Sequence, residues 1–421
     1  MLLYRSYPSG RACSARANAP GLVLVLVGAI VGLLVPTRVV AAEALPSAVS
    51  ATAGTMPVPA EEPLSPTKVE HAAASALETG SAAAASETYG SASMLGGALD
   101  TIDRRVLLGA FADIGFFATE SGKRRDFQIG QLVLHGTVDL PKGFGAFAEV
   151  TVNSSPVWET RVERVLLTWE WSDALKLSLG RHHLPVTWWN ATFHHGLWLQ
   201  TTARRPLMIG YSDALIPNHA IGLIAEGLLP FWSALGLRYH LSLNGGGDDH
   251  KHTVAGAKEK GRLAATAGLF AEPPALPALR VGAVAYWDPQ RVRSGKQVAE
   301  TLVGAHAIWT DERPEIAAEW VLVHHQEQGA ATPFLSNAAY LQLAWRLAGS
   351  GEPFKPYVRY DRMRLEERDP TLQSVLSRDQ WTLGLRWDVA SQVALRVEGA
   401  RKVPREQAAT WEALVQVSAT W

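Results

Sequence analysis

The stretch WEALVQVSATW, residues 411–421, alternates apolar and polar side chains with a period of two. Successive side chains of a β-strand point to opposite faces, so this period predicts a strand with two different faces. The segments 379–389 and 234–243 show the same alternation. In 411–421, one face carries Trp411, Ala413, Val415, Val417, Ala419 and Trp421, and the other carries Glu412, Leu414, Gln416, Ser418 and Thr420.

Segments of this kind recur from Arg104 onward, separated by turn residues. We count about 16, an even number, as a bacterial single-chain barrel requires. The predicted fold is therefore all-β, an antiparallel transmembrane β-barrel of about 16 strands, with about 14 or 18 left open. The segments are 105–117, 127–140, 144–153, 161–171, 175–183, 218–227, 233–243, 261–271, 279–288, 298–309, 314–325, 338–347, 354–362, 378–389, 392–401 and 409–421.

The connections between these segments alternate in length. Short turns are expected at 141–143, 172–174, 310–313 and 390–391, and longer, more polar loops fall between them. Outer-membrane barrels have short periplasmic turns and long external loops. The alternation holds along the whole segment list, which supports the strand assignment.

A soluble sandwich or propeller is the alternative for a period of two. Two features weigh against it. The apolar faces are continuous on nearly every segment while the opposite faces carry ionic residues, and tryptophans stand at segment ends, where a membrane barrel has aromatic girdles. The tryptophans at expected periplasmic ends are Trp171, Trp309, Trp345, Trp387 and Trp421; those at expected external ends are Trp287, Trp381 and Trp411.

The 421 residues carry a formal charge of −1 and are 47% hydrophobic. The charge balance gives no argument for a nucleic-acid partner. Residues 1–42 are expected to be a signal peptide, with a basic start, an apolar run at 21–36 and small residues at 40–42. A transmembrane anchor is the alternative, although the run is short for a span. The single cysteine, Cys13, lies in this leader, so no disulfide is expected in the mature chain.

Residues 43–99 are rich in Ala, Ser, Glu, Thr and Pro and contain one aromatic residue, Tyr89. Such a segment buries too little apolar surface to offset its ordering entropy, so we expect a disordered periplasmic linker. The barrel is expected to occupy residues 100–421.

The chain resembles the bacterial outer-membrane porin superfamily, and most closely the phosphate-selective O/P-type porins. The hairpin residues 164–170 (RVLLTWE) and 175–181 (LKLSLGR), followed by Pro185, carry this likeness. Trp421 at the end of an alternating strand resembles the signal read by the barrel-assembly machinery. The resemblance implies a bacterial outer-membrane protein, a homotrimer, contact with outer-membrane lipids and passage of small hydrophilic solutes or ions. The loop after Pro185 matches no binding motif, so phosphate specificity is not implied.

The longest connection, residues 184–217, joins the fifth and sixth segments. In 16-stranded porins the third external loop folds into the lumen, and the resemblance implies the same here. An aromatic-rich loop of this length is costly in water and makes sense when packed inside the barrel. The alternative is that the aromatics only pin the loop and its charges are solvated. The candidate constriction residues on this loop are Trp188, Trp189, His194, His195, Arg204 and Arg205.

Inward-facing arginines are concentrated on the later strands and carboxylates on the earlier ones. Opposed charges in a pore orient solutes, and an excess of one sign selects ions, so we expect a slight anion preference. The alternative is that Glu300, Glu319, Asp361 and Glu398 pair locally with these arginines. The candidates for the pore wall are Arg238, Arg280, Arg359 and Arg386, with Glu149 opposite; Arg262, Arg346 and Arg396 share their face.

Histidine pairs occur at 182–183, 194–195 and 324–325. Adjacent residues of a strand point to opposite faces, so such pairs do not chelate on their own, and no metal site or cofactor is expected. The chain has no G-x-S-x-G, H-E-x-x-H, Walker or C-x-x-C motif, so no enzyme is expected.

Three functions are consistent with these patterns. The first is a porin for passive diffusion of small hydrophilic solutes with a slight anion preference. The second is a substrate-specific channel for an anion or a phosphate-type solute, with the third loop as its binding site. The third is a structural barrel that anchors the envelope, with residues 43–99 bound to the cell wall.

Overall fold

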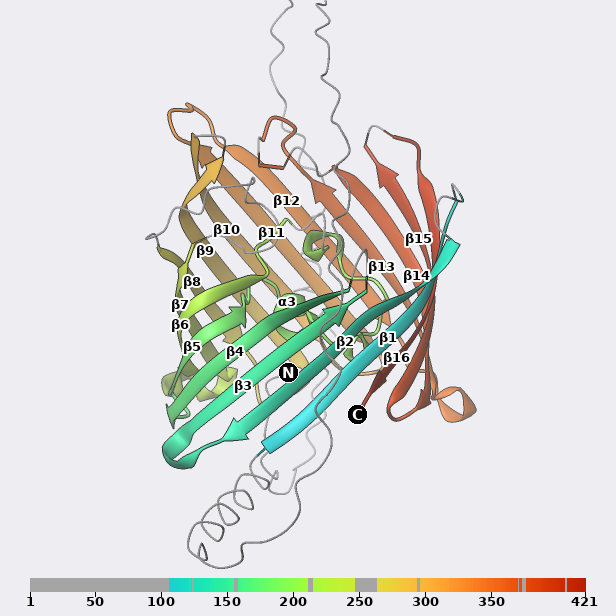
Figure 1. Cartoon of the computed structure of the whole chain (residues 1–421), viewed down its shortest axis with the longest axis horizontal. Coiled ribbons are helices and arrows are strands. Elements are labelled where there is room, and N and C mark those ends of the chain that lie inside the picture. Colours follow the sequence, from blue (N-terminus) through green and yellow to red (C-terminus); the bar gives the residue numbers. More distant parts are fainter. Residues whose placement is uncertain are drawn as a thin grey trace, which may run out of the picture. The chain divides into compact units, whose positions relative to one another are not determined.

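The computed structural model describes residues 106–421 apart from 121, 123–124, 155–157, 211–214, 247–262, 294–295, 370, 373–375 and 406. The leader and linker predicted at 1–42 and 43–99 lie outside the described residues. Within them, sixteen strands form one closed antiparallel barrel, which confirms the predicted fold (Figure 1). The strands are β1 (Val106–Thr119), β2 (Arg125–Asp139), β3 (Phe144–Asn153), β4 (Glu159–Ser172), β5 (Leu175–His183), β6 (His219–Leu228), β7 (Leu237–Gly245), β8 (Leu263–Ala271), β9 (Leu279–Arg293), β10 (Lys296–Trp309), β11 (Glu315–Glu327), β12 (Phe334–Ala344), β13 (Phe354–Arg364), β14 (Arg378–Ala390), β15 (Val393–Pro404) and β16 (Thr410–Thr420).

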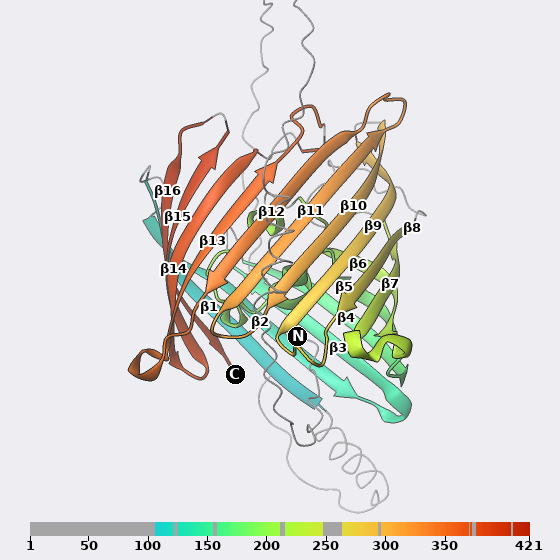
Figure 2. The same ribbon diagram turned by 180° about the vertical axis from the view of Figure 1, so that it is seen from behind.

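Each strand pairs with its neighbours in sequence, and β1 pairs with β16 to close the ring (Figures 1 and 2). The closing register joins Ala112 to Ala419, and the Ala110 and Trp421 backbones exchange two hydrogen bonds of 2.9 and 3.2 Å beyond the last residue of β16. Closure leaves no sheet edge with unpaired backbone groups, which a lipid environment would not tolerate.

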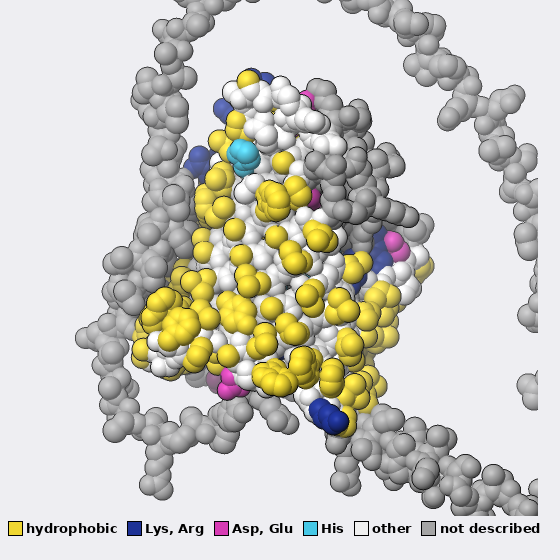
Figure 3. Space-filling view, turned by 90° about the vertical axis from the view of Figure 1, so that its left-hand side faces the viewer, with side chains coloured by type: hydrophobic (Ala, Val, Ile, Leu, Met, Phe, Trp, Pro, Cys, Tyr) yellow, Lys and Arg dark blue, Asp and Glu magenta, His cyan; other side chains and the backbone are white. Residues whose placement is uncertain are grey.

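Strand alternation sorts the side chains into two surfaces. The outward side chains are apolar and exposed, and Figure 3 shows one wall covered by hydrophobic side chains with charged groups at its margins. Leu108 is 82% exposed and Leu383 is 69% exposed, which water would penalise and lipid would not. Most exposed tryptophans stand near the strand ends, as an aromatic girdle requires; Trp287 lies within β9, because that strand continues to Arg293. Those toward the short turns are Trp171, Trp345, Trp387 and Trp421, and those toward the long loops are Trp287, Trp381 and Trp411.

The short turns contain brief 3₁₀ helices: η1 (Pro141–Gly143), η4 (Pro230–Leu235) and η5 (Gly349–Gly351). The largest boundary difference from the sequence prediction is at β9, which continues to Arg293 where 288 was predicted; β7 and β12 also differ. The seventh strand begins at Leu237 and not at 233, because η4 occupies the preceding residues and ends at left-handed Gly236. The twelfth strand spans 334–344 and not 338–347, and its outward face continues into exposed Trp345.

The connection between β5 and β6, residues 184–218, is here called loop L3, and it lies inside the ring of strands (Figure 1). It contains one short α-helix, α3 (Trp188–Phe193), and two 3₁₀ turns, η2 (Leu197–Leu199) and η3 (Leu207–Ile209). Among the described residues no helix is long and apolar enough to cross a bilayer. The position of L3 inside the ring of strands confirms the predicted inward-folding third loop.

Candidate functional site

Helix α3 lies near the start of L3, and a residue of the barrel wall binds the first amides of this helix. Thr187 accepts a hydrogen bond from the Asn190 amide at 3.1 Å, which is an N-cap of α3. Glu319 of β11 accepts from the Trp188 and Trp189 amides at 2.6 and 3.0 Å. A carboxylate is favourable there, because the first amides of a helix have no partner within the helix. The Tyr340 hydroxyl also donates to Glu319, at 2.6 Å.

Three wall arginines hold the backbone carbonyls of L3. Arg396 donates to the carbonyls of residues 197, 198, 200 and 201, and Arg386 donates to those of 198 and 200. Arg359 is fully buried and donates to the carbonyls of residues 204 and 205, at 2.8 and 2.9 Å. Arg359 and Arg386 were predicted to line a water-facing pore wall, whereas the structure places their guanidinium groups against the loop.

Wall carboxylates complete this attachment by accepting from L3. Glu398 accepts from the Ala203 amide at 2.9 Å and from the Tyr357 hydroxyl at 2.8 Å. Asp361 accepts from the Leu207 amide at 3.0 Å. Buried backbone groups need hydrogen-bond partners, and an irregular loop supplies few of its own, so the wall provides them.

Apolar packing fastens the other part of L3. Residues of the loop and of β9–β13 form one buried hydrophobic cluster inside the barrel. Gly304 of β10 allows this approach, because a Cβ at that position would collide with the Val186 carbonyl oxygen. The loop residues in the cluster are Leu184, Val186, Trp189, Met208, Ile209, Leu215 and Ile216; the wall residues include Tyr286, Leu302, Ile308, Val321, Val323, Tyr340 and Met363.

Arg204 and Arg205 occupy different environments on L3. Arg204 lies between two carboxylates, 3.4 Å from Glu398 and 3.5 Å from Glu412, and 13% of its side chain is exposed. Arg205 donates to the His194 carbonyl at 2.6 Å, and its guanidinium carbon lies 5.2 Å from the Trp189 ring centre. Both side chains are partly exposed, so among the predicted constriction residues they retain access to water.

His194 and His195 are buried, at 2% and 6% exposure, and do not face a water-filled constriction as expected. Burial lowers the pKa of His194 well below its usual range, and the nearby Arg205 charge lowers it further. Burial also lowers the pKa of His195, although contact with Glu163 opposes that effect. Both imidazoles are therefore neutral at pH 7.

The remaining predicted residues are distributed over the barrel. Glu149 is buried and receives two hydrogen bonds from Arg164, at 3.0 and 2.8 Å. Arg280 donates to the Pro277 carbonyl at 2.7 Å, near the short-turn end. Arg238 lies at the start of β7, at the same end, and is partly buried. Their roles in a pore stay predictions, as does the role of Trp421 in assembly.

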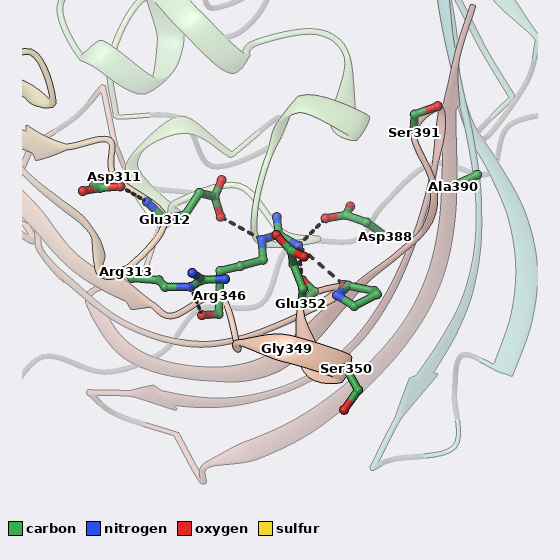
Figure 4. A pocket seen from close by; sticks show the side chains of 11 residues that line it. Asp311, Glu312, Arg313, Arg346, Gly349, Ser350, Glu352, Asp388, Ala390 and Ser391 are labelled. Atoms are coloured by element: carbon green, nitrogen blue, oxygen red, sulfur yellow. Dashed lines mark hydrogen bonds and ion pairs between the residues drawn. The ribbon is translucent and has the colours of Figure 1, made fainter.

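The short-turn end has an open cavity of about 780 Å³ with a charged lining. Figure 4 shows Arg346 between two carboxylates there, 3.0 Å from Glu312 and 2.5 Å from Asp388. Burial raises the pKa of Glu312, but Lys355 and Arg346 outweigh this effect and hold it below its usual range. This mouth therefore has charges of both signs.

Four of the residues that hold L3 were not among the predicted site residues: Arg396, Glu319, Glu398 and Asp361. The strand alternation placed Arg396 on the inward face with the other arginines, and nothing else in the sequence indicated its role. The alternative was that Glu300, Glu319, Asp361 and Glu398 pair locally with the arginines. Asp361 does pair with Arg359 at 2.8 Å, whereas Glu319 accepts from backbone amides and a tyrosine hydroxyl.

A scan against protein-family models finds no match, and a search of curated proteins finds none. Solved structures do match. The anion-selective porin from Comamonas acidovorans is 12% identical, with a TM-score of 0.55 over 75% of this chain and 99% of that chain. The outer membrane channel DcaP of Acinetobacter baumannii is 10% identical, with a TM-score of 0.53 over 75% of this chain and 97% of that chain. In-vitro folded OmpT of Vibrio cholerae, in trimer form, is 12% identical, with a TM-score of 0.51 over 75% and 99%.

The fold is that of the porins. At these identities the likeness concerns the fold alone. A closed barrel with an apolar outer surface is a structure of the bacterial outer membrane, because only helices and closed barrels satisfy the backbone in lipid. The porin fold does not by itself assign a solute or a selectivity.

Proposed function

We propose that this chain forms a water-filled channel for passive diffusion of small hydrophilic solutes or ions across the outer membrane. The observation that carries the proposal is the sorting of side chains, with apolar residues outside and ionic residues inside a closed barrel. L3 attached to the wall at the depth of the lumen supports a channel of restricted width. We assign no catalytic step to the chain.

We further propose that any anion preference is weak and depends on Arg204 and Arg205. Three of the other inward arginines are buried against L3 carbonyls. Two of these, Arg359 and Arg386, also pair with Asp361 and Asp388 at 2.8 and 2.7 Å, so they contribute less to the field that a solute meets. Arg204 lies between Glu398 and Glu412, which reduces its net effect.

Single-channel recording across a planar bilayer in a salt gradient tests both proposals. We expect stepwise openings and a small reversal potential whose sign indicates anion passage. The variant Arg204→Ala/Arg205→Ala should move the reversal potential toward cation passage, whereas the control Arg313→Ala at an exposed short turn should leave it unchanged. A folded, heat-modifiable barrel without any current would refute the channel.

A substrate-specific channel is the second candidate, and the two partly exposed arginines of L3 favour it over an anchoring role. Arg205 beside the Trp189 ring offers an anion both a positive charge and a flat surface. Saturable block of the current by inorganic phosphate, lost in Arg204→Ala/Arg205→Ala, would support this candidate. Block that survives in the variant would exclude these residues as its site. An envelope-anchoring role would rest on residues 43–99, outside the described part of the chain.

We also propose a homotrimer surrounded by outer-membrane lipid and inserted by the barrel-assembly machinery through Trp421, after removal of residues 1–42. Trp421 is 64% exposed and follows β16 directly, so a partner has access to it. Cross-linking in membranes tests the trimer, and the mass of the exported chain tests the cleavage.

A further inference from the structure

Four histidines gather at the point where L3 leaves and rejoins the wall. Two form a cross-strand pair, because the last residue of β5 faces the first residue of β6. The other two follow α3, and the loop returns them over this pair. Their possible ligand atoms all lie within 4.8 Å of one another. The four are His183, His194, His195 and His219, here called the histidine cluster.

The ring separations in the histidine cluster match a metal site. The centroid distances are 4.5, 5.2, 4.9, 4.5, 4.6 and 6.1 Å. A tetrahedral Zn–N site with bonds of about 2.0–2.1 Å places its nitrogens roughly 3.3 Å apart and its ring centres roughly 5 Å apart. Closing around an ion therefore requires each donor atom to move by only about 1 Å.

The hydrogen bonding of these rings also needs an explanation. His195 is buried, its Nδ1 has no hydrogen-bond partner among the described residues, and its Nε2 lies 3.5 Å from Glu163. The Nε2 of His183 is likewise buried without a hydrogen-bond partner among them. Packing of aromatic rings accounts for the proximity of histidines but leaves these nitrogens unsatisfied, which is costly in a protein interior.

The protonation state of His194 is determined by its neighbour. The Asn190 side-chain nitrogen donates to the Leu184 and Asn218 carbonyls at 2.8 and 3.0 Å, so its oxygen is the atom that faces His194. His194 Nδ1 lies 2.6 Å from that oxygen and must donate to it. Its Nε2 therefore carries a lone pair. Ligand histidines in proteins are oriented in this way, through a hydrogen bond from the other ring nitrogen.

A carboxylate stands beside the other rings and supplies negative charge. Glu163 lies 3.1 Å from His219 Nε2 and 3.5 Å from His195 Nε2. If each Nε2 carries a proton directed at Glu163, each Nδ1 keeps a lone pair that can bind a metal. This is the carboxylate–histidine–metal arrangement. Glu149 lies 3.9 Å from His183 Nε2 but is already paired with Arg164. Glu163 lies farther from its arginine neighbour, 4.0 Å from Arg181, so it is the main counter-charge for a cation.

We propose that the histidine cluster binds one divalent transition-metal ion, and that Zn²⁺ fits it best. Imidazole nitrogens suit Zn²⁺, Cu²⁺ and Ni²⁺, and four imidazoles in a compact group suit the tetrahedral preference of Zn²⁺. Such an ion cross-links the strand residues on either side of L3, His183 and His219, to the loop segment after α3. The site is structural in this sense, and it makes the docking of L3 depend on metal.

Metal binding is measured directly on the untagged full-length chain, folded in detergent and stripped with a chelator. Titration with Zn²⁺ in competition with a chromophoric chelator should show one tight equivalent per chain. Replacement by Co²⁺ should give the intense visible bands of tetrahedral coordination, and this readout needs no variant. Absence of a tight equivalent in the folded wild-type chain, or the weak spectrum of octahedral Co²⁺, overturns the proposal.

Variants locate the bound ion. His195→Asn and His219→Asn should each weaken Zn²⁺ binding by at least a hundredfold. The matched control is His306→Asn, which alters a buried histidine of β10 that stacks on Phe270, and it should bind Zn²⁺ like wild type. A tight equivalent that persists in both cluster variants assigns the ion elsewhere and refutes the proposal. If a variant fails to fold, as judged by heat-modifiable migration, the Co²⁺ spectrum of the wild-type chain decides.

Discussion

Replacing Arg396 with methionine tests whether the wall arginines hold L3 in the lumen. The side chain is fully buried, and its guanidinium donates to four L3 carbonyls and, at 2.6 Å, to the Ser418 hydroxyl. Methionine keeps much of the length and the apolar stem but cannot donate. The loop carbonyls of residues 197 and 201 then lose the cationic partner that the structure gives them.

The expected cost follows from these contacts. A hydrogen bond to a charged group contributes about 1.5–3 kcal/mol, and the bonds of one guanidinium are not additive. Leaving a buried carbonyl without a donor costs about 1–3 kcal/mol, so two such carbonyls cost roughly 2–6 kcal/mol together. Arg386 continues to hold residues 198 and 200, so the lower part of this range applies. About 3 kcal/mol shifts the ratio of docked to undocked L3 by roughly a hundredfold, since about 1.4 kcal/mol corresponds to tenfold.

Single-channel recording provides the assay. Arg396→Met should show larger or flickering unitary currents, because segment 197–201 leaves its position part of the time. Arg280→Met is the matched control: it also removes one inward charge, but Arg280 binds turn carbonyls near the short-turn end. If Arg396→Met and Arg280→Met give the same unitary current and noise as wild type, the anchoring role of Arg396 is refuted.

Three further predictions follow from the same contacts. Gly304→Ala should destabilise the barrel by about 1–3 kcal/mol through collision with the Val186 carbonyl, seen as a lower unfolding temperature in detergent; an unchanged midpoint would contradict the close approach. Glu319→Ala should leave the first amides of α3 without a partner, and chymotrypsin should then cleave L3 faster than in wild type. Burial raises the pKa of Asp369, but hydrogen bonds from His325 and Thr371 outweigh this and hold it below its usual range. Because the pKa of Asp369 is lower in the folded chain, ionised Asp369 stabilises the loop above about pH 4, and this stabilisation is lost as the pH falls further. Pepsin should therefore cut loop 365–377 more readily near about pH 2 than near about pH 4, and Asp369→Asn should remove that difference.

The strands were predictable because their signal is local. A period of two and the turn residues around it identified all sixteen strands, most within two to four residues. The error at β7 arose because 233–236 continue the alternation in sequence while forming part of a 3₁₀ helix. The inward course of L3 followed from its aromatic residues together with the resemblance to porins.

The interior contacts of L3 were not predictable from the same signal. Parity places Arg359 and Arg396 on the inner face but does not say whether they meet water or a loop carbonyl. Adjacent histidines were expected not to converge, and that rule holds on a strand. His194 and His195 follow a helix, where backbone direction changes, and their partners are the facing end residues of the consecutive strands β5 and β6. Only the path of L3 brings these groups together.

Ionic attachment of L3 has a physical reason that bears on selectivity. An irregular loop inside a barrel makes few regular backbone hydrogen bonds, and each buried amide or carbonyl without a partner is costly. Inward-facing arginines and carboxylates at the depth of the loop are therefore taken up by its carbonyls and amides, as in the contacts of Arg396 and Glu398. A count of inward charges then overstates the field in the pore. Arg204 and Arg205 lie on L3 itself and are partly exposed, so we propose them as the residues to vary first when selectivity is measured.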